Sequence, residues 1–468
     1  MGVLSALKKK LAGKPDKSVG TTEKKKKKNK YIVYIAEKNN IPYSQAKAMM
    51  DEAKVKFADH DLNYRGYVKN HLDELDEAGQ LKAIKAAEKK AERTKERSIN
   101  NLMNVTGQSR EEVLERLDYV KETFGLGPKA YYGRMYYSMT DDEIREDMEN
   151  RKITEAKYVT LCAERSGKTE SEIRKHMFRV SNLYSMDSHD YLLFNAWRHT
   201  DEELAEFLTI KHSRKMPVKY NERDKGIITA DKILFNKVFK DYTNRKFWVN
   251  EDTSYEEFCE FIDGLEYIFA KPINLCQGRG ARKIVLSEVE DTRVLYDELM
   301  AEPKMLIEEG VIQHPVMRAV HPNSINTVRT FCLQKDGECH VLAAFVRFGL
   351  NGSVVDNMVA GGSIAGVDEK TGIIETPIID REGNAYEVHP NTGIRVLGMQ
   401  IPMWDEILEI SKKALQHVDG LNYLGWDIAI TEKGPVMIEA NTMPGMGAYQ
   451  TGYAYYGKGM LYKFKDYM

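Results

Sequence analysis

The sequence predicts an α+β domain that is preceded by an all-α helical-repeat region. Three observations support this assignment: a helical pattern recurs at an offset of 60 residues, strand-like and helix-like runs alternate after about residue 226, and a polar stretch separates the two parts. The expected organisation is a disordered basic tail over 1–30, helical repeats over 31–210, a linker over 211–225, an α+β domain over 226–450 and a C-terminal tail over 451–468.

Length and composition exclude several classes of protein. The chain has 468 residues, of which 42% are hydrophobic and 30% charged, and its formal net charge of -2 gives no reason to expect nucleic acid as a partner. Its 5 cysteines are odd in number and never form a C-x-x-C, which favours a reducing, cytoplasmic setting. No apolar run reaches the roughly 18 residues that span a bilayer, and the N-terminus lacks the apolar core of a signal peptide.

The first 30 residues are strongly basic and include the run "EKKKKKNK" (Glu23 to Lys30), which predicts disorder through self-repulsion. Before this run, "VLSALKKKL" (Val3 to Leu11) has the pattern of a short amphipathic helix with lysines beside it. Such a segment could dock on an anionic membrane, which would place the protein at the inner face of that membrane. A solvated tail without a partner is the alternative.

The helical region carries an internal repeat. "TGQSREEVLERLDYV" (Thr106 to Val120) matches "SGKTESEIRKHMFRV" (Ser166 to Val180) without a gap. Four capping boxes are expected at the starts of its helices, in which a hydroxyl caps the helix and a glutamate three residues later reaches back: Ser109 with Glu112, Thr140 with Glu143, Thr169 with Glu172, and Thr200 with Glu203. The repeats could form a docking surface for a protein or glycan partner, or they could only support the downstream domain.

The segment "GWDIAITEKGPVMIEAN" (Gly425 to Asn441) predicts a hairpin closed by a three-residue loop, Glu432 to Gly434. In that register Asp427 lies opposite Glu439, and Asn441 shares their face. The opposite, buried face would hold Trp426, Ile428, Ile430, Val436, Ile438 and Ala440. Because opposed carboxylates destabilise a strand pair and a cation removes the penalty, these hard oxygen donors suggest a Mg²⁺ site. An exposed acidic hairpin edge is the alternative.

Three further segments could bind a nucleotide. Lys271 ends a strand before a glycine loop with Gly278, Arg279 and Gly280, whose amides and cations could cover a polyphosphate, although a plain hairpin loop is an equal alternative. "KMLIEEGV" (Lys304 to Val311) ends a strand, so that the backbone at Glu308, Glu309 and Val311 could contact an adenine edge, while an ordinary strand end explains it equally well. Lys232 begins a helix, where a solvated lysine is the simpler interpretation.

Taken together and in this order, these elements resemble the ATP-grasp superfamily over about residues 225–450. Finer segments are similar to its sugar-transfer-associated branch, which is related to teichuronopeptide-type ligases: "HPNSINTVRTFCL" (His321 to Leu333), "DNMVAGGSIAGVDEKTG" (Asp356 to Gly372) and "HPNTG" (His389 to Gly393). The resemblance implies a two-lobe catalytic domain with ATP between the lobes, phosphates at Lys232 and Lys271 under the glycine loop, adenine at residues 308–311, and Mg²⁺ or Mn²⁺ at Asp427, Glu439 and Asn441.

The same resemblance implies an ADP-forming ligase that joins a small or glycan-linked carboxylate to an amine through an acyl phosphate, in surface-polysaccharide or cell-envelope biosynthesis. Arg329, with Arg347 second, is the candidate for stabilising the transferring phosphoryl group, and surface strand arginines are the alternative. A kinase whose phosphorylated product is final, and a scaffold that only senses nucleotide, are the other functions considered.

Two departures from the family pattern stand out. Peptide-ligase relatives often carry an arginine two residues before the first metal carboxylate, and here Gly425 occupies that position. The place of the usual Rossmann-like domain is taken by the helical repeats. Either Arg329 replaces the missing arginine or the reaction differs.

Overall fold

The protein is described here by a computed structural model that covers residues 42, 44, 92, 95–100, 102–103, 106–125, 136–251, 253–273 and 280–468. The chain divides into two compact units, Met1–Val113 and Leu114–Met468. The predicted basic tail, and with it the predicted membrane contact, lies outside the described residues. Within the described part of the chain, no helix is long and apolar enough to cross a membrane.

Helices account for the regular structure of the described chain before residue 247. They are α6 (Arg110–Thr123), α8 (Asp141–Ser166), α9 (Glu170–Tyr184), α10 (Ser188–Leu193), η2 (Ala196–Arg198), α11 (Asp201–Ala205), α12 (Ile210–Ser213), α13 (Lys215–Tyr220), η3 (Asp224–Gly226), α14 (Ile227–Ala230), α15 (Lys232–Val238) and α16 (Lys240–Thr243). All four predicted capping boxes are present, at Ser109, Thr140, Thr169 and Thr200.

One pair of equivalent contacts, 60 residues apart in the chain, reflects the predicted repeat. The Tyr119 hydroxyl donates to the carboxylate of Asp141, and Arg179, 60 residues after Tyr119, donates to Asp201 at 2.6 and 2.9 Å. The helices that begin at Asp141 and Asp201 differ in length, with 26 and 5 residues. A full repeat architecture over 31–210 therefore stays a prediction.

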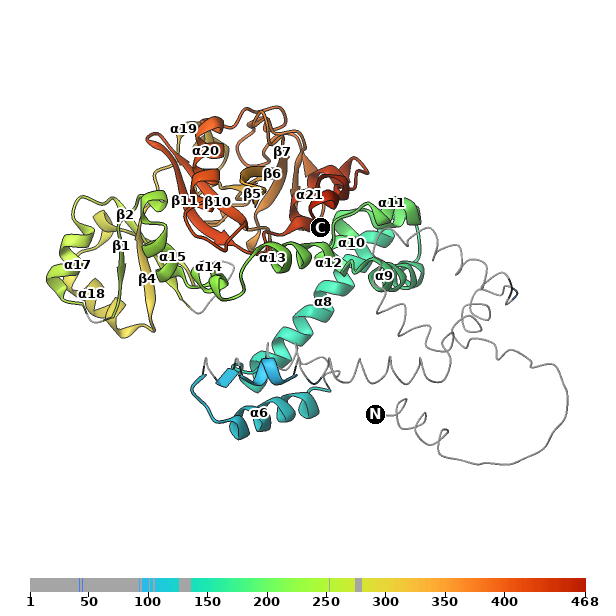
Figure 1. Ribbon diagram of the computed structural model, residues 1–468, viewed down its shortest axis with the longest axis horizontal. Helices are drawn as coiled ribbons and strands as arrows, with labels where there is room; N and C mark the ends of the chain where they lie inside the picture. The colour runs from blue at the N-terminus through green and yellow to red at the C-terminus, as the bar shows by residue number, and fades with distance from the viewer. Residues whose placement is uncertain are drawn as a thin grey trace. The chain divides into compact units, whose positions relative to one another are not determined.

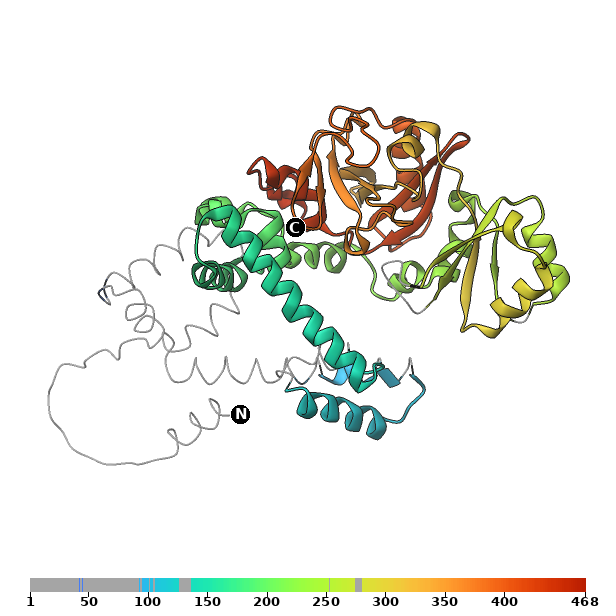
Figure 2. The same cartoon turned by 180° about the vertical axis from the view of Figure 1, so that it is seen from behind.

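Residues 211–225 and 451–468 differ from the predicted linker and tail. The first stretch forms α12, α13 and η3, and its Met216 is fully buried. The second continues α21 (Met446–Tyr455) and adds η6 (Leu461–Lys463) and η7 (Lys465–Tyr467), where Phe464 is buried. Figures 1 and 2 show α21 beside α10 and α12. Each stretch contains a buried apolar residue, Met216 or Phe464, that packs it against the rest of the domain.

A four-stranded antiparallel sheet forms the first lobe of the α+β domain. Its strand order is β1 (Phe247–Val249), β4 (Met305–Glu309), β2 (Tyr267–Pro272) and β3 (Arg282–Val285). One face packs against α17 (Tyr255–Ile262) and α18 (Thr292–Ala301), and η4 (Leu286–Glu288) lies between β3 and α18. Because side chains alternate along a strand, Ile268 and Ala270 join this core while Phe269 and Lys271 face the opposite way.

A seven-stranded antiparallel sheet forms the second lobe. Its strand order is β11 (Gly434–Asn441), β10 (Tyr423–Thr431), β5 (Val328–Lys335), β6 (Glu338–Phe348), β7 (Ser363–Val367), β8 (Ile378–Asp380) and β9 (Ala385–Tyr386). The lobe also contains α19 (Pro315–Val320), η5 (Met358–Ala360) and α20 (Trp404–Leu415).

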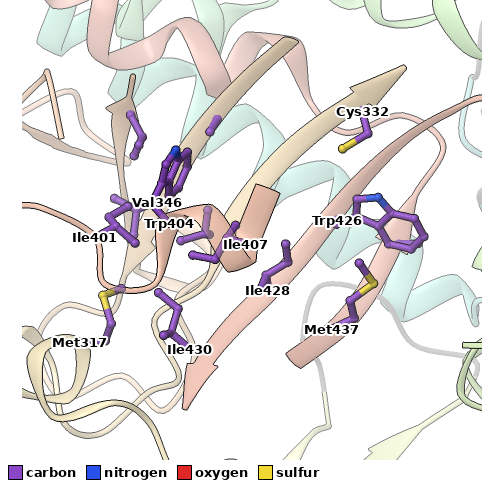
Figure 3. Close-up of a cluster of buried hydrophobic side chains, with 14 of the residues drawn as sticks. Met317, Cys332, Val346, Ile401, Trp404, Ile407, Trp426, Ile428, Ile430 and Met437 are labelled. Carbon is purple, nitrogen blue, oxygen red and sulfur yellow. The ribbon is translucent and has the colours of Figure 1, made fainter. Parts of the chain in front are cut away.

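The two faces of this sheet differ. One face packs on α20 through a core that includes Trp426, Ile428, Val346 and Ile407, as Figure 3 shows. The other face carries Arg329, Arg347 and Asp427. The mixed helix-and-sheet class predicted from the sequence is confirmed for this part of the chain.

Candidate active site

A cleft of about 530 Å³ lies between the two sheets. Its walls bring together ten of the residues predicted from the sequence: Lys232, Lys271, Glu308, Glu309, Val311, Arg329, Arg347, Asp427, Glu439 and Asn441. Gly278 and Arg279 lie outside the described residues. Gly280 is the first described residue after that gap and is not among the residues that line the cleft.

The predicted register of the acidic hairpin is confirmed, because Asp427 pairs with Glu439. The route to this register differs from the prediction. Thr431 pairs with Gly434, so the turn has two residues, and a register shift beyond Ile428 leaves Ile438 as an extra, bulged residue. With this two-residue turn and no bulge, Glu439 would lie opposite Trp426, on the buried side of the hairpin.

The bulge also changes which side chains are buried on each face. Met437, not Ile438, joins the main core beside Ile428. Val436 lies on the opposite face in a small cluster with Ala429 and Val311, and Ile438 packs against that cluster. The prediction that Val436 and Ile438 line the main core is therefore wrong, because one inserted residue inverts the alternation of side chains.

Two arginines hold Asp427. Arg329 on the neighbouring strand donates to both carboxylate oxygens through Nε and Nη2, and Nη2 of Arg347 lies 2.8 Å from Oδ2. Burial of Asp427 raises its pKa, but the two guanidinium groups outweigh that effect and hold the pKa well below its usual range. The two arginines therefore favour the ionised form of Asp427.

Glu439 has a different environment. About half of its side chain is accessible (51%), and the nearest guanidinium nitrogen, Nη2 of Arg329, is 3.8 Å away. Its partial burial in the cleft wall, and then the carboxylate of Asp427 opposite, raise the pKa of Glu439. Its Oε1 accepts from the Asn441 amide at 3.1 Å. Glu439 is thus the more weakly paired carboxylate of the two.

Thr327 and Asp356, which were not predicted from the sequence, orient the guanidinium of Arg347. Its Nε and Nη2 donate to the Thr327 hydroxyl at 2.9 and 2.6 Å, and that hydroxyl donates in turn to Asp356. Nε of Arg347 also lies 3.4 Å from Asp356. Both residues fall in segments that carry the family resemblance, "NTV" and "DNMVAGG", and that was the available signal for them.

A second ionic cluster lies on the wall formed by the first lobe. The carboxylate of Glu308 is buried, with 1% of its side chain exposed, and forms ion pairs with Lys271 and, at 3.1 Å, with Arg245. Asn236 donates to the same carboxylate at 3.3 Å. Burial opposes ionisation of Glu308, but Arg245 and Lys271 lower its pKa to about 2. No spacing in the sequence distinguishes Asn236 or Arg245 as site residues.

The other predicted nucleotide contacts are placed around this cluster. Nζ of Lys232 donates to the Pro272 carbonyl at 2.7 Å. Glu309 accepts from the Lys246 amide at 2.9 Å, and the Val311 carbonyl accepts from the Tyr267 hydroxyl at 2.5 Å. Gly310 between them packs directly on the Tyr267 ring, where any side chain would collide with it. The strand end at 308–311 is thus a wall of the cleft whose side chains already have partners.

Gly425 has no room for the arginine that peptide-ligase relatives often carry. A Cβ atom there would lie 2.1 Å from Cβ of Pro444 and 3.1 Å from Cδ of Arg329. The side chain of Arg329 crosses this space from β5, and its Nη1 donates to the Pro444 carbonyl at 2.9 Å. A guanidinium from the neighbouring strand therefore lies where one from position 425 would have to pass.

We expect Gly425→Ala to lower the free energy of unfolding by about 1–3 kcal/mol, because the methyl group must displace Pro444. Urea denaturation measures the change. Gly226→Ala is the matched control, since a Cβ at Gly226 meets nothing within 4 Å. Equal stabilities for Gly425→Ala and the wild type would contradict the close packing.

Hard oxygen donors meet at the hairpin, but both carboxylate oxygens of Asp427 already pair with arginines. Among the described residues, no group of three or more histidine, cysteine, aspartate or glutamate side chains is placed to hold a metal ion. Glu439 and Asn441 open onto the cleft, and Oδ1 of Asp427 is paired only with Nε of Arg329 in the contacts above. This donor set fits a divalent cation held mainly by Glu439 and Asn441.

Two antiparallel sheets face each other across a cleft lined with lysines, arginines and paired carboxylates, which is the two-lobed arrangement that the resemblance predicts. Residues 282–463 match the family described as sugar-transfer associated ATP-grasp, which confirms the resemblance seen in the sequence. None of the curated proteins matches the chain.

Solved structures that match part of the chain include a synthetase, a ligase and a synthase. D-alanyl-alanine synthetase A from Vibrio cholerae is 14% identical with a TM-score of 0.32, covering 51% of this chain and 63% of its own. The ATP-grasp ligase PsnB, complexed with a minimal precursor, is 16% identical (TM-score 0.31, 49% and 57%). Carboxyaminoimidazole ribonucleotide synthase from Aspergillus clavatus, complexed with ATP, is 10% identical (TM-score 0.30, 47% and 47%). The chain thus spans less than two thirds of the length of each.

Proposed function

We propose that the protein is an ATP- and Mg²⁺-dependent ligase that joins a carboxylate to an amine with release of ADP and phosphate. The observation that carries the proposal is the charge of the two cleft walls. One wall has Lys232, Arg245 and Lys271 against Glu308 and Glu309, and the other has Arg329 and Arg347 against Asp356, Asp427 and Glu439. Cations facing a carboxylate-rich wall suit a polyphosphate that carries a divalent ion.

Each residue group has a distinct part in this proposal. Lys271 and Lys232 bind phosphate oxygens, and the wall at Val311 and Tyr267 holds the base. Glu439 and Asn441, with Asp427, would hold Mg²⁺, which supplies charge neutralisation at the phosphates when bound. Arg329 keeps Asp427 ionised and in place, and Arg347, oriented by Thr327 and Asp356, is the nearer candidate for contact with the transferring phosphoryl group.

The proposed reaction balances in two steps. A carboxylate oxygen of the first substrate takes the γ-phosphoryl group of ATP, and ADP leaves. The amine of the second substrate then attacks the acyl carbon, phosphate leaves with the C–O electron pair, and the amine loses a proton. Positioning and charge neutralisation carry such chemistry without a protein nucleophile. The sugar-transfer description of the family supports a glycan-linked substrate and a place in surface-polysaccharide synthesis.

We expect purified protein to release ADP, rather than AMP, from ATP and Mg²⁺ in the presence of a pool of uronic acids, amino acids and amines, and mass spectrometry to detect an adduct lacking one water. A stable phosphorylated product without an adduct would favour a kinase instead. No ADP with any pool would favour a nucleotide sensor.

Lys271→Ala should raise the apparent KM for ATP or lower kcat by about tenfold or more, because a charged hydrogen bond to phosphate is lost. Lys304→Ala is the matched control, since Lys304 is an exposed lysine of the same lobe, ion-paired with Glu251. Unchanged kinetics for Lys271→Ala, measured by ADP release, would refute the phosphate contact.

A further inference from the structure

Arg245 connects the two lobes of the cleft through one nitrogen atom. Its side chain is 7% exposed, and the residue lies in the short connection between α16 and β1. Nη2 lies 3.1 Å from Oε1 of Glu308 in the first lobe and donates to the Met437 carbonyl in the second, also at 3.1 Å. The residue lies before the segment matched by the family, and it belongs to the cleft lining.

The contact in the second lobe reaches the acidic hairpin. Met437 is the residue before the bulged Ile438, and Glu439 follows it. Strand β11 is at the edge of its sheet, so it has a neighbouring strand on one side only, and α14, α15 and α16 pack against it. A hydrogen bond at Met437 therefore fixes the edge strand at the point where its register shifts, and with it the place of the Glu439 carboxylate.

The contact in the first lobe reaches Lys271. A buried carboxylate needs cationic partners, and Glu308 has two, Arg245 and Lys271. Because Arg245 takes part of the charge of Glu308, Lys271 is not the sole counter-ion of that carboxylate. A lysine that shares its partner can contact a phosphate oxygen without leaving Glu308 unpaired.

From these contacts we infer that Arg245 is a positioning residue for both halves of the site: it holds Glu439 through Met437 and frees Lys271 through Glu308. The inference rests on the proposed binding of nucleotide and divalent cation in this cleft. Its consequence is that binding of the nucleotide and binding of the cation both depend on one arginine, which acts through Glu308 and Met437.

The test measures binding rather than turnover, with ADP by calorimetry and with Mn²⁺ by electron paramagnetic resonance in the presence of ADP. Arg245→Lys keeps the buried charge, but the shorter lysine side chain does not place a nitrogen where Nη2 of Arg245 contacts both partners. We expect it to weaken ADP and Mn²⁺ binding each by about tenfold, the loss of one charged hydrogen bond. Arg293→Lys is the matched control, because Arg293 is an exposed arginine of the first lobe paired with Asp297.

A double-mutant cycle separates positioning from a general structural effect. If Arg245 acts through Glu439, Arg245→Lys adds little further loss of Mn²⁺ affinity in a Glu439→Gln background. Should Arg245→Lys not fold, Arg245→Gln combined with Glu308→Gln removes the buried charges together, and it is compared with Glu308→Gln alone. There the loss of Arg245 should still weaken Mn²⁺ binding about tenfold.

Two results would overturn the inference while leaving the proposed function standing: wild-type affinities in Arg245→Lys, or a fully additive cycle. A wild-type protein that binds neither ADP nor Mn²⁺ would refute the proposed function itself.

Discussion

Glu439→Gln is expected to reduce turnover by at least about 100-fold while increasing the stability of the metal-free protein. Replacement of a residue that only orients a metal ligand typically costs about 10–100-fold in activity. The loss of turnover should be at least as large here, because the variant lacks a charged metal ligand. The stability gain follows from the pKa of Glu439, which is raised in the folded protein. The folded state then binds more protons than the unfolded state above the ordinary carboxyl pKa, so ionisation of Glu439 opposes folding as pH rises, and glutamine removes that cost.

Thermal denaturation with and without Mg²⁺ and ADP tests both effects in one experiment. Without ligands, Glu439→Gln should unfold at a higher temperature than the wild type at pH 7, and Mg²⁺ with ADP should stabilise the wild type more than the variant. Glu432→Gln, in the turn of the same hairpin, is the matched control and should behave as the wild type. Equal stabilisation of Glu439→Gln and wild type by Mg²⁺ and ADP would exclude Glu439 as a metal ligand.

Glu308→Gln is expected to lower the free energy of unfolding by about 3–5 kcal/mol at pH 7, because it leaves the buried guanidinium of Arg245 and the partly buried ammonium of Lys271 without a carboxylate. The loss depends on pH in a defined direction. The pKa of Glu308 is lowered to about 2 in the folded state, so its stabilising effect is complete above the ordinary carboxyl pKa and is lost as pH falls through about 2.

Urea denaturation at a series of pH values between 7 and 2.5 measures that difference. The gap between wild type and Glu308→Gln should narrow as the pH falls below about 4.5. Glu302→Gln provides the comparison, since Glu302 and Arg282 form an exposed pair at 3.4 Å whose loss should change stability by less than about 1 kcal/mol. A gap that is constant with pH would show that Glu308 stabilises the lobe by packing rather than by charge.

The acidic hairpin shows how far the sequence could be interpreted. Alternation of apolar and acidic residues placed Asp427 opposite Glu439 correctly, because both sit on strands whose far face is unmistakably apolar. The bulge at Ile438 was not predictable, since a two-residue turn plus one extra residue and a three-residue loop give the same register at the acids. The two hairpins differ only in which side chains pack against Val436 and Ile438.

The arginines around Asp427 illustrate a second limit. Arg329 and Arg347 were selected, but their partnership with Asp427 depends on β5 lying between β10 and β6, and strand order is not written in local pattern. The role of Arg245 could not be predicted for the same reason, because its partners Glu308 and Met437 lie 63 and 192 residues away in the chain. The family resemblance selected residues within motifs and could not select one outside them.

The edge position of β11 has a consequence for the cell as well as for catalysis. An uncovered edge strand exposes backbone groups that can pair with another chain, which is a route to aggregation. Helices α14 to α16 pack against β11 and Arg245 donates to its Met437 carbonyl, so the segment that we propose to position Glu439 also packs on an edge strand of the sheet. Selection for solubility and selection for ligand binding therefore act on the same short stretch of chain, and changes there will be filtered by both.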